Sequence, residues 1–122
     1  LLKSEGYQAV DMHYHTRISV DGMASIPSVI EKCKKEVIGI AVTDHNHYEG
    51  ALQADKLSRK GVFVIPGMEI TCHNGAHILL HFYNIGEFKE FYQTQFKNRI
   101  KKNPWFIDLN HEEVVDLASR YN

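Results

Sequence analysis

The sequence predicts an α/β domain with a mainly parallel sheet, and two observations support this fold class. Short apolar segments alternate with longer segments in which apolar residues recur at helical spacing, which indicates β-α-β units. The segment 38–43 (IGIAVT) is apolar without interruption, as expected of a parallel strand that is buried on both faces. Ligands of such sheets bind at the carboxyl ends of the strands, so a functional site is expected there.

The first part of the chain predicts two strands around one helix. Residues 8–12 are expected to form the first strand. After a polar loop, Ser25 can cap a helix whose first turn holds Pro27, where the missing N–H costs no hydrogen bond. The second strand is then 38–43. One apolar stripe marks the buried side of the helix and consists of Ile26, Val29, Ile30, Cys33 and Val37.

A second helix and a third strand are expected next. The helix is marked by Ala51, Ala54 and Leu57, which share one face. Gly61 is expected to end this helix, because glycine adopts the left-handed conformation that helix C-termini favour. The third strand, 62–65, is predicted to end at Pro66-Gly67.

The last part of the chain predicts a hairpin and two helices. Segments 70–72 and 76–82 flank Asn74-Gly75, and Asn-Gly is a strong signal for a tight hairpin turn. Asn110, with Glu113 three residues later, resembles a capping box at the start of the last helix. The first helical stripe consists of Phe88, Phe91, Tyr92, Phe96 and Ile100, and the second of Val114, Leu117, Ala118 and Tyr121.

Length and composition fit one globular domain, 1–122. The chain has 122 residues, 43% of them hydrophobic and 24% charged, and its 14 basic and 15 acidic side chains give a net charge of −1. This balance gives no general reason to expect binding to membranes or nucleic acid. One segment carries several basic side chains, which is typical of the solvent-exposed side of a helix; a nucleic-acid-binding surface is the alternative. The basic residues are Lys97, Arg99, Lys101 and Lys102. Two cysteines are too few for a disulfide framework, which favours a reducing, cytoplasmic setting.

Polar side chains follow the first two predicted strands at the point where each strand ends. Asp11, His13 and His15 alternate along the chain and are expected to project to one side. The two imidazoles could then bind one metal ion while the carboxylate orients a ligand; a pair of surface histidines is the alternative. The second strand ends in Asp44-His45. His45 is the ligand candidate, whereas Asp44 is expected to point away from it and to support the site.

Further candidates come from the third strand and the hairpin. Glu69 lies in an apolar segment, where a carboxylate is costly to bury unless it is paired or binds a cation. His77 and His81 share a face of the second hairpin strand, so one of them could join the same cluster. Cys72 is expected to serve packing. The histidines without an assigned role are His47, His73 and His111, of which the last two are expected at the surface. Three successive strands that end in HxH, DH and E indicate a metal site.

Three segments carry a combined motif: DMHYHTRISVDG, IGIAVTDHNHYEGALQA and VIPGMEITCHNGAHILL. Together they resemble the PHP (polymerase and histidinol phosphatase) superfamily, over residues 7–82 and with the spacing preserved. Small stand-alone PHP phosphoesterases are the most similar group. An amidohydrolase-type enzyme also begins its barrel with HxH, but TDHN and GMEI favour the PHP family. The resemblance implies a partial, distorted (β/α)7 barrel with flanking helices.

The resemblance also implies a cluster of up to three divalent metal ions, which would be zinc, manganese or iron. The first two imidazoles of the motif would share one metal with Glu69. Asp21 would join His45 on another, and Glu69 would bridge toward a third metal that His77 holds in part. The full set of implied ligands is His13, His15, Asp21, His45, Glu69 and His77.

Supporting roles and a reaction follow from the same resemblance. Asp11 and Asp44 match positions that support the ligands, and His81 matches no ligand position. The implied reaction is hydrolysis of a phosphate ester by a metal-activated water, which requires no protein nucleophile; the substrate would be a small phosphorylated molecule or a nucleotide. Arg17 is a candidate to hold the substrate phosphate, because a guanidinium binds phosphate bidentately. An ordinary solvated loop cation is the alternative.

The family completes its cluster with later residues that this sequence does not contain. They are a histidine, often in an Ala-His-Pro strand, and a C-terminal Asp-x-His. Since the chain also begins with Leu1 rather than methionine, we expect the N-terminal portion of a PHP domain, truncated at its C-terminal side. The alternative function is a catalytically inactive metal-binding or interaction module. An incomplete sheet has an exposed edge, which predicts a homo-oligomer or a missing C-terminal segment.

Overall fold

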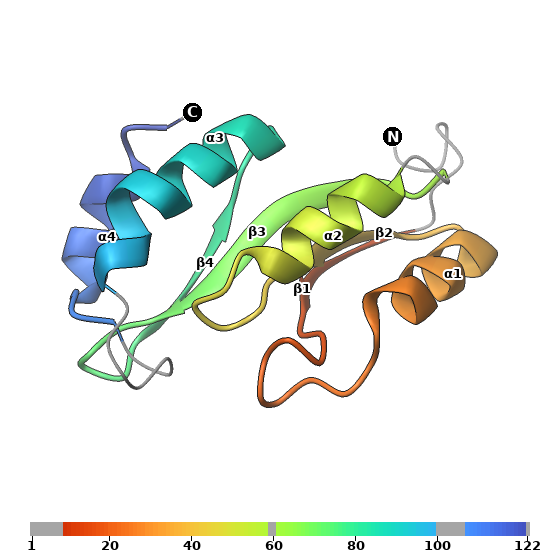
Figure 1. Cartoon of the computed structure of the whole chain (residues 1–122), viewed down its shortest axis with the longest axis horizontal. Coiled ribbons are helices and arrows are strands. Elements are labelled where there is room, and N and C mark those ends of the chain that lie inside the picture. Colours follow the sequence, from red (N-terminus) through yellow and green to blue (C-terminus); the bar gives the residue numbers. More distant parts are fainter. Residues whose placement is uncertain (1–8, 59–60, 100–106, 122) are drawn as a thin grey trace.

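The structure is a computed structural model, and it describes residues 9–58, 61–99 and 107–121. Four strands form one sheet in the order β1-β2-β3-β4. The first three are parallel, and β4 is antiparallel to β3. The sheet curls like part of a barrel (Figure 1), so the expected α/β class with a mainly parallel sheet is confirmed. The strands are β1 (Val10–Tyr14), β2 (Gly39–Val42), β3 (Val64–Thr71) and β4 (His77–His81).

The helices pack against one face of this sheet (Figure 1). They are α1 (Ile26–Glu36), α2 (Glu49–Leu57), α3 (Ile85–Phe91) and α4 (His111–Ala118). Helix α3 continues into one π-helical turn, Tyr92–Phe96, and a short 3-10 turn, Lys97–Arg99. None of the helices in the described part of the chain has the length and apolar character that crossing a membrane requires.

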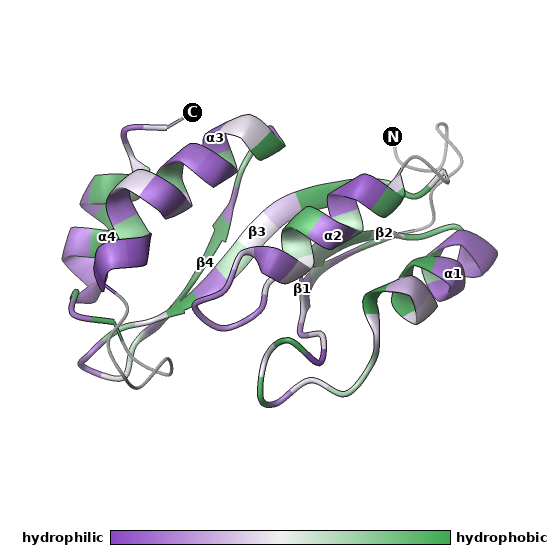
Figure 2. Cartoon of the chain, in the orientation of Figure 1, coloured by the Kyte–Doolittle hydropathy of each residue, from purple (hydrophilic) through white to green (hydrophobic). Residues whose placement is uncertain are grey.

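Two apolar clusters lie between the helices and the sheet, and hydrophobic residues of the helices alternate with hydrophilic ones (Figure 2). The first joins α1 and α2 to β2 and includes Ile26, Ile30, Ile40, Val42 and Ala54. The second joins α3 and α4 to β3 and includes Met68, Ile70, Phe88, Phe91, Val114 and Leu117. Successive side chains of a strand point to opposite faces. Because Met68 and Ile70 of β3 enter the core, Glu69 and Thr71 face the concave side of the sheet.

The prediction that the third strand ends at Pro66-Gly67 is wrong, because β3 runs through both residues. Pro66 pairs with Val42 on one side, and its carbonyl accepts a hydrogen bond from the backbone of Phe82 (2.8 Å). Gly67 is required where it stands, since a Cβ atom there would lie 2.7 Å from the backbone oxygen of Leu80. The turn-like pair therefore allows β4 to approach β3 closely instead of ending the strand.

The predicted helix starts are confirmed. The hydroxyl of Ser25 accepts a hydrogen bond from the backbone of Ser28 (3.4 Å) and caps α1. Asn110 and Glu113 form a reciprocal capping box at α4. Helix α4 ends at Ala118, however, and does not reach Tyr121. The Tyr121 ring instead packs edge-on against Phe82 and Phe91. The predictions for Gln8, Ile100, Lys101 and Lys102 lie outside the described residues.

Candidate metal centre

A bulge in β1 directs the first histidines to the concave side. The pairing register of β1 with β2 shifts between Asp11 and Tyr14, and such a shift turns side chains away from strict alternation. The prediction that Asp11, His13 and His15 project together is therefore wrong. Asp11 lies on the α1 side, where it lines a cavity of about 410 Å³ together with Cys33. Its carboxylate accepts a hydrogen bond from the backbone N–H of His13 (3.0 Å), so it supports the main chain and not the imidazole.

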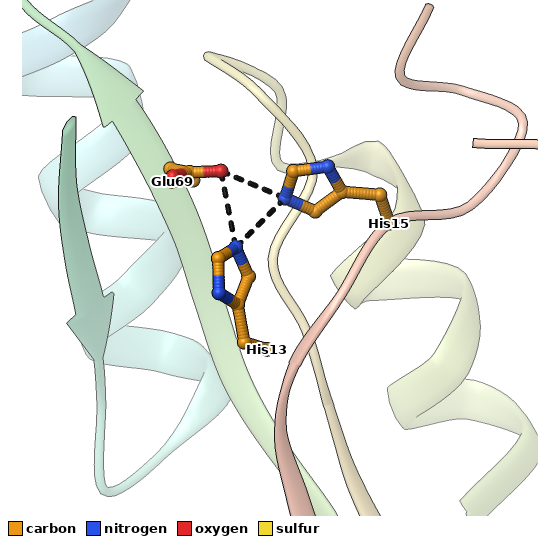
Figure 3. Close-up of side chains that lie close together, drawn as sticks. All are labelled: His13, His15 and Glu69. Carbon is orange, nitrogen blue, oxygen red and sulfur yellow. Dashed lines mark hydrogen bonds and ion pairs between the residues drawn. The ribbon is translucent and has the colours of Figure 1, made fainter. Parts of the chain in front are cut away.

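Both histidines meet Glu69 across the concave face. His13 lies one residue before the end of β1, His15 follows in the loop, and Glu69 lies on β3. All three side chains point into one space (Figure 3). The Nε2 atoms of the two imidazoles are 3.1 Å apart. Glu69 Oε2 lies 2.7 Å from Nε2 of His15 and 3.2 Å from Nε2 of His13. Three donor atoms thus form a small triangle that one cation could share.

A second group of donors forms around Asp21, in the loop before α1. Asp21 Oδ2 lies 2.7 Å from Nδ1 of His15 and 3.0 Å from Nε2 of His45. Its other oxygen, Oδ1, accepts a hydrogen bond from the Ser19 hydroxyl (2.7 Å). The same hydroxyl accepts one from the backbone of His45 (3.2 Å). Ser19 therefore fixes Asp21 to the end of β2.

A third group joins His45 and Glu69 to His77 on β4. His45 Nε2 lies 3.5 Å from Glu69 Oε2, and His77 Nδ1 lies 3.5 Å from Glu69 Oε1. The rings of His45 and His77 have their centroids 5.5 Å apart. Between them lies the hydroxyl of Thr71, 3.0 Å from His45 Nδ1 and 3.3 Å from His77 Nδ1.

The donor atoms of these three groups fit divalent metal ions in kind and in spacing. In each group the ligand atoms lie within 4.8 Å of one another. Donors that bind one tetrahedral ion at roughly 2.1 Å lie about 3.4 Å apart, close to the distances found around Glu69. Imidazole and carboxylate ligands suit zinc, manganese and iron, and their type does not select among these metals.

The carboxylate of Asp21 is held in its charged form. Burial by itself raises the pKa of Asp21, but the hydrogen bonds from Ser19 and His15 and the charges of His15 and His45 together outweigh this effect. The pKa therefore lies well below its ordinary value. A carboxylate that is charged at neutral pH can bind a cation without first losing a proton.

Asp44, for which the sequence predicts a supporting role, is buried just after β2 and contacts the loop that carries His15. It is 1% exposed, and its carboxylate accepts hydrogen bonds from the backbone (2.6 Å) and the hydroxyl (2.8 Å) of Thr16. Burial raises the pKa of Asp44, and the Thr16 hydrogen bonds act in the opposite direction. A Cβ atom at Gly50 would lie 2.1 Å from Asp44 Oδ2, so only glycine leaves room for it. Because Thr16 follows His15, this contact locks the His15 loop onto β2.

Other predicted residues lie outside the donor groups. Arg17 is exposed, and its backbone N–H donates to the carbonyl of Ala24. The imidazole of His81 donates a hydrogen bond from Nε2 to the carbonyl of Met12 (2.9 Å) and so connects β4 to β1. Cys72 is fully buried in the core, as expected of a packing residue. His73 and His111 are exposed, as predicted.

Sequence reasoning missed three buried polar residues that support the donors: Ser19, Asn46 and Thr71. Asn46 adopts a left-handed backbone (φ 51°), donates its N–H to the carbonyl of Glu69 and accepts from the Thr71 N–H through Oδ1. Asn is one of the few residues that tolerate this conformation. The sequence TDHN offered this signal, since an asparagine directly after a buried strand often serves such a turn.

Two solved structures are similar to this chain. A 29% identical structure from Bifidobacterium adolescentis, assigned as a metal-dependent phosphoesterase, superposes with a TM-score of 0.60 over 75% of this chain and 33% of its own. An amidohydrolase structure from Chromobacterium violaceum, solved with bound sulfate and no metal, is 25% identical, with a TM-score of 0.59 over 74% of this chain and 32% of its own. The chain therefore spans about a third of the length of the structures it matches. No curated protein sequence matches it significantly.

The family comparison covers nearly the whole described chain. The model of the PHP domain matches residues 11–118, a range that includes the β1 histidines, Asp21, the end of β2 and the β3-β4 hairpin. The match therefore includes all the residues that meet on the concave face of the sheet. This match and the half-barrel sheet confirm the resemblance seen in the sequence: the chain belongs to the PHP domain family.

Proposed function

We propose that this chain carries the metal centre of a metal-dependent hydrolase that cleaves phosphate esters with water. The observation that carries the proposal is the meeting of four imidazoles and two carboxylates from β1, the β1-α1 loop, β2, β3 and β4 on one concave face. The similarity to a structure assigned as a metal-dependent phosphoesterase supports the choice of reaction. Both cysteines are free and buried, which supports a reducing, cytoplasmic setting.

The chain's own residues would hold divalent cations in three adjoining groups. They are His13, His15 and Glu69; His15, Asp21 and His45; and His45, Glu69 and His77. Divalent cations supply Lewis-acid chemistry: they neutralise phosphate oxygens and lower the pKa of water. Glu69 is 6% exposed and belongs to two groups, so its charge would compensate cations held at both.

The remaining roles are binding and orientation. Asp21 stays charged and closes the second group, while Ser19 and Asp44 keep the surrounding loops in place. Arg17 lies exposed in the loop that also carries Asp21. We propose that its guanidinium binds the substrate phosphate, which is a small phosphorylated molecule or a nucleotide.

A second function is favoured by the extent of the match. The chain spans about a third of the length of the structures it resembles, and the activities in their names belong to those longer proteins. The second candidate is a metal-binding or interaction module without turnover. Both functions require cation binding, and only the first requires hydrolysis.

Metal titration and hydrolysis assays on this chain test both functions. We expect Mn²⁺ or Zn²⁺ to bind to the wild type, as read by isothermal titration calorimetry. Glu69→Gln should weaken binding more than about tenfold, since even outer-shell partners of metal ligands are worth about 10- to 100-fold. Asp21→Asn should have the smaller effect, because it leaves two of the three donor groups complete.

The control is His73→Ala, which removes an exposed histidine that belongs to none of the donor groups. Hydrolysis of an aryl phosphate that depends on the added cation supports the hydrolase. Cation binding without turnover of aryl phosphates or aryl amides supports the module. Equal affinities in the wild type and Glu69→Gln would contradict both.

A further inference from the structure

Thr71 is placed between two imidazoles of the candidate metal centre. It is 3% exposed and lies on the concave side of β3, two residues after Glu69. Its hydroxyl is 3.0 Å from Nδ1 of His45 and 3.3 Å from Nδ1 of His77. Its backbone is held as well, because its N–H donates to Oδ1 of the buried Asn46 (3.0 Å). The hydroxyl therefore has a fixed place and two ring nitrogens as neighbours.

The other nitrogen of His45 faces the carboxylates. Nε2 lies 3.0 Å from Asp21 and 3.5 Å from Glu69, so Nδ1 is the nitrogen that faces into the protein. In a neutral imidazole one nitrogen carries the proton and the other accepts. A carboxylate only accepts, so an Nε2 that donates to Asp21 leaves Nδ1 needing a donor. If Nε2 instead binds a cation, it carries no proton. The proton is then on Nδ1, which needs a hydrogen-bond acceptor.

A hydroxyl satisfies both requirements, because it donates one hydrogen bond and accepts others. We propose that Thr71 is a positioning residue whose hydroxyl keeps Nδ1 of His45 hydrogen-bonded in either tautomer and links this ring to His77. When the hydroxyl accepts from His45, its own proton points to His77; when it donates to His45, it can accept from His77. The states of the two rings, and of the donor groups they belong to, are coupled through one oxygen.

This inference rests on the proposed metal centre, but the contact between Thr71 and His45 can be measured without adding a cation. Thr71→Val keeps the shape of the side chain and removes the hydroxyl. Thr71→Ser keeps the hydroxyl and removes a methyl group. Thr43→Val is the matched control, since Thr43 is also fully buried at a strand end and its hydroxyl contacts only the carbonyl of Tyr14 (3.4 Å) among the hydrogen bonds described.

The first readout is the imidazole ¹⁵N spectrum of the cation-free protein, which distinguishes the tautomers of each ring. We expect the His45 signals to move in Thr71→Val, the His77 signals to move with them, and both to stay near wild-type positions in Thr71→Ser and Thr43→Val. The second readout is cation affinity by calorimetry with Mn²⁺ and with Zn²⁺. Loss of a partner to a ligating histidine typically weakens metal binding about 10- to 100-fold, and this is the range expected for Thr71→Val.

The outcomes separate the two proposals. A wild-type protein that binds neither cation overturns the metal centre, while the His45 spectrum still decides the role of Thr71. Unchanged His45 signals in Thr71→Val overturn the role of the hydroxyl, and so does a Thr71→Ser variant that behaves like Thr71→Val, because packing of the methyl group would then be responsible. If Thr71→Val does not fold, Thr71→Ala makes the same comparison without an added methyl group.

Discussion

At the scale of single residues, several donors of the candidate metal centre belong to more than one donor group. His15, His45 and Glu69 each belong to two of the three groups. His15 does so through opposite nitrogens, with Nδ1 toward Asp21 and Nε2 toward Glu69. Shared donors keep neighbouring groups within a few ångströms of each other, the arrangement in which two metal ions can act on one phosphate.

The two cysteine thiols, in contrast, are buried away from solvent. Cys33 and Cys72 are 4% and 0% exposed, and burial raises the pKa of both thiols. We expect neither to react with a disulfide reagent at pH 8 in the folded protein, since the thiolate is the reactive form. Both should react after unfolding in denaturant. Rapid reaction of either thiol in the native protein would contradict this burial.

The same shifts predict a loss of stability at alkaline pH. A folded-state pKa above the unfolded value stabilises the protein fully below the unfolded pKa, and this contribution is lost as the pH rises through the folded pKa. The free energy of unfolding should therefore fall from pH 8 upward, and Tyr92, whose pKa is also raised by burial, adds to the fall near its own range. The measurement is urea unfolding at several pH values. The Cys33→Ala/Cys72→Ala variant should show a shallower fall, and an equal slope would show that the thiols do not contribute.

How much of the site the sequence predicts depends on how local each signal is. His13, His15, His45 and Glu69 follow from the ends of apolar strands, because a parallel sheet brings such ends together. The prediction that Asp11 faces the same side as His13 is wrong, since strict alternation fails at a bulge that only the pairing with β2 reveals. Thr71 gave no signal of its own, because a threonine in a strand is expected for its β-propensity alone. Its role arises from two imidazoles that other strands deliver.

At the scale of elements, the predicted boundaries hold where local chemistry decides them. Ser25 and Asn110 start their helices because their side chains satisfy the first free N–H groups. The strand end at Pro66-Gly67 was wrong for a tertiary reason. A turn signal describes what the backbone tolerates, and Gly67 is needed for the close approach of β4. Sequence patterns alone do not distinguish these two uses of glycine.

The end of helix α1 offers a test of local strain. Val37 caps this helix in the left-handed conformation (φ 55°) and is 45% exposed. This conformation costs a residue with a Cβ atom about 1–2 kcal/mol, and glycine adopts it freely. Val37→Gly should therefore raise the free energy of unfolding by about 1 kcal/mol after the entropy of glycine is included. Chemical denaturation followed by circular dichroism measures the change.

The control for this substitution is Val115, an exposed valine inside helix α4. Val115→Gly lies where the backbone is right-handed, so it should lower stability by about 0.5 kcal/mol. Opposite signs for the two substitutions identify backbone conformation as the cause. A loss of stability in Val37→Gly would mean that the apolar contacts of Val37 outweigh the strain.

At the scale of the whole molecule, the curled sheet brings its two edges toward each other. Strands β1 and β4 are the edges of the sheet in the described part of the chain. The hydrogen bond from His81 to the Met12 carbonyl connects them, beside a cavity of about 440 Å³ that Met12, Phe63 and Tyr83 help to line. The β1 edge also carries His13, one of the donors of the candidate metal centre.

We propose that this chain self-associates through the β1 edge. Among the described residues no strand pairs with the outer side of β1, and an exposed strand edge favours pairing with another strand. Met12 on β1 is 42% exposed, and Val20 and Met23 in the loop after β1 are 71% and 92% exposed. Sedimentation velocity of the cation-free protein should show oligomers that grow with concentration. Met12→Lys should reduce association, because a lysine on an edge strand opposes pairing, whereas Val115→Lys on α4 should not. A monomer at every concentration contradicts the proposal, and equal effects of the two lysines would place the contact elsewhere than on β1.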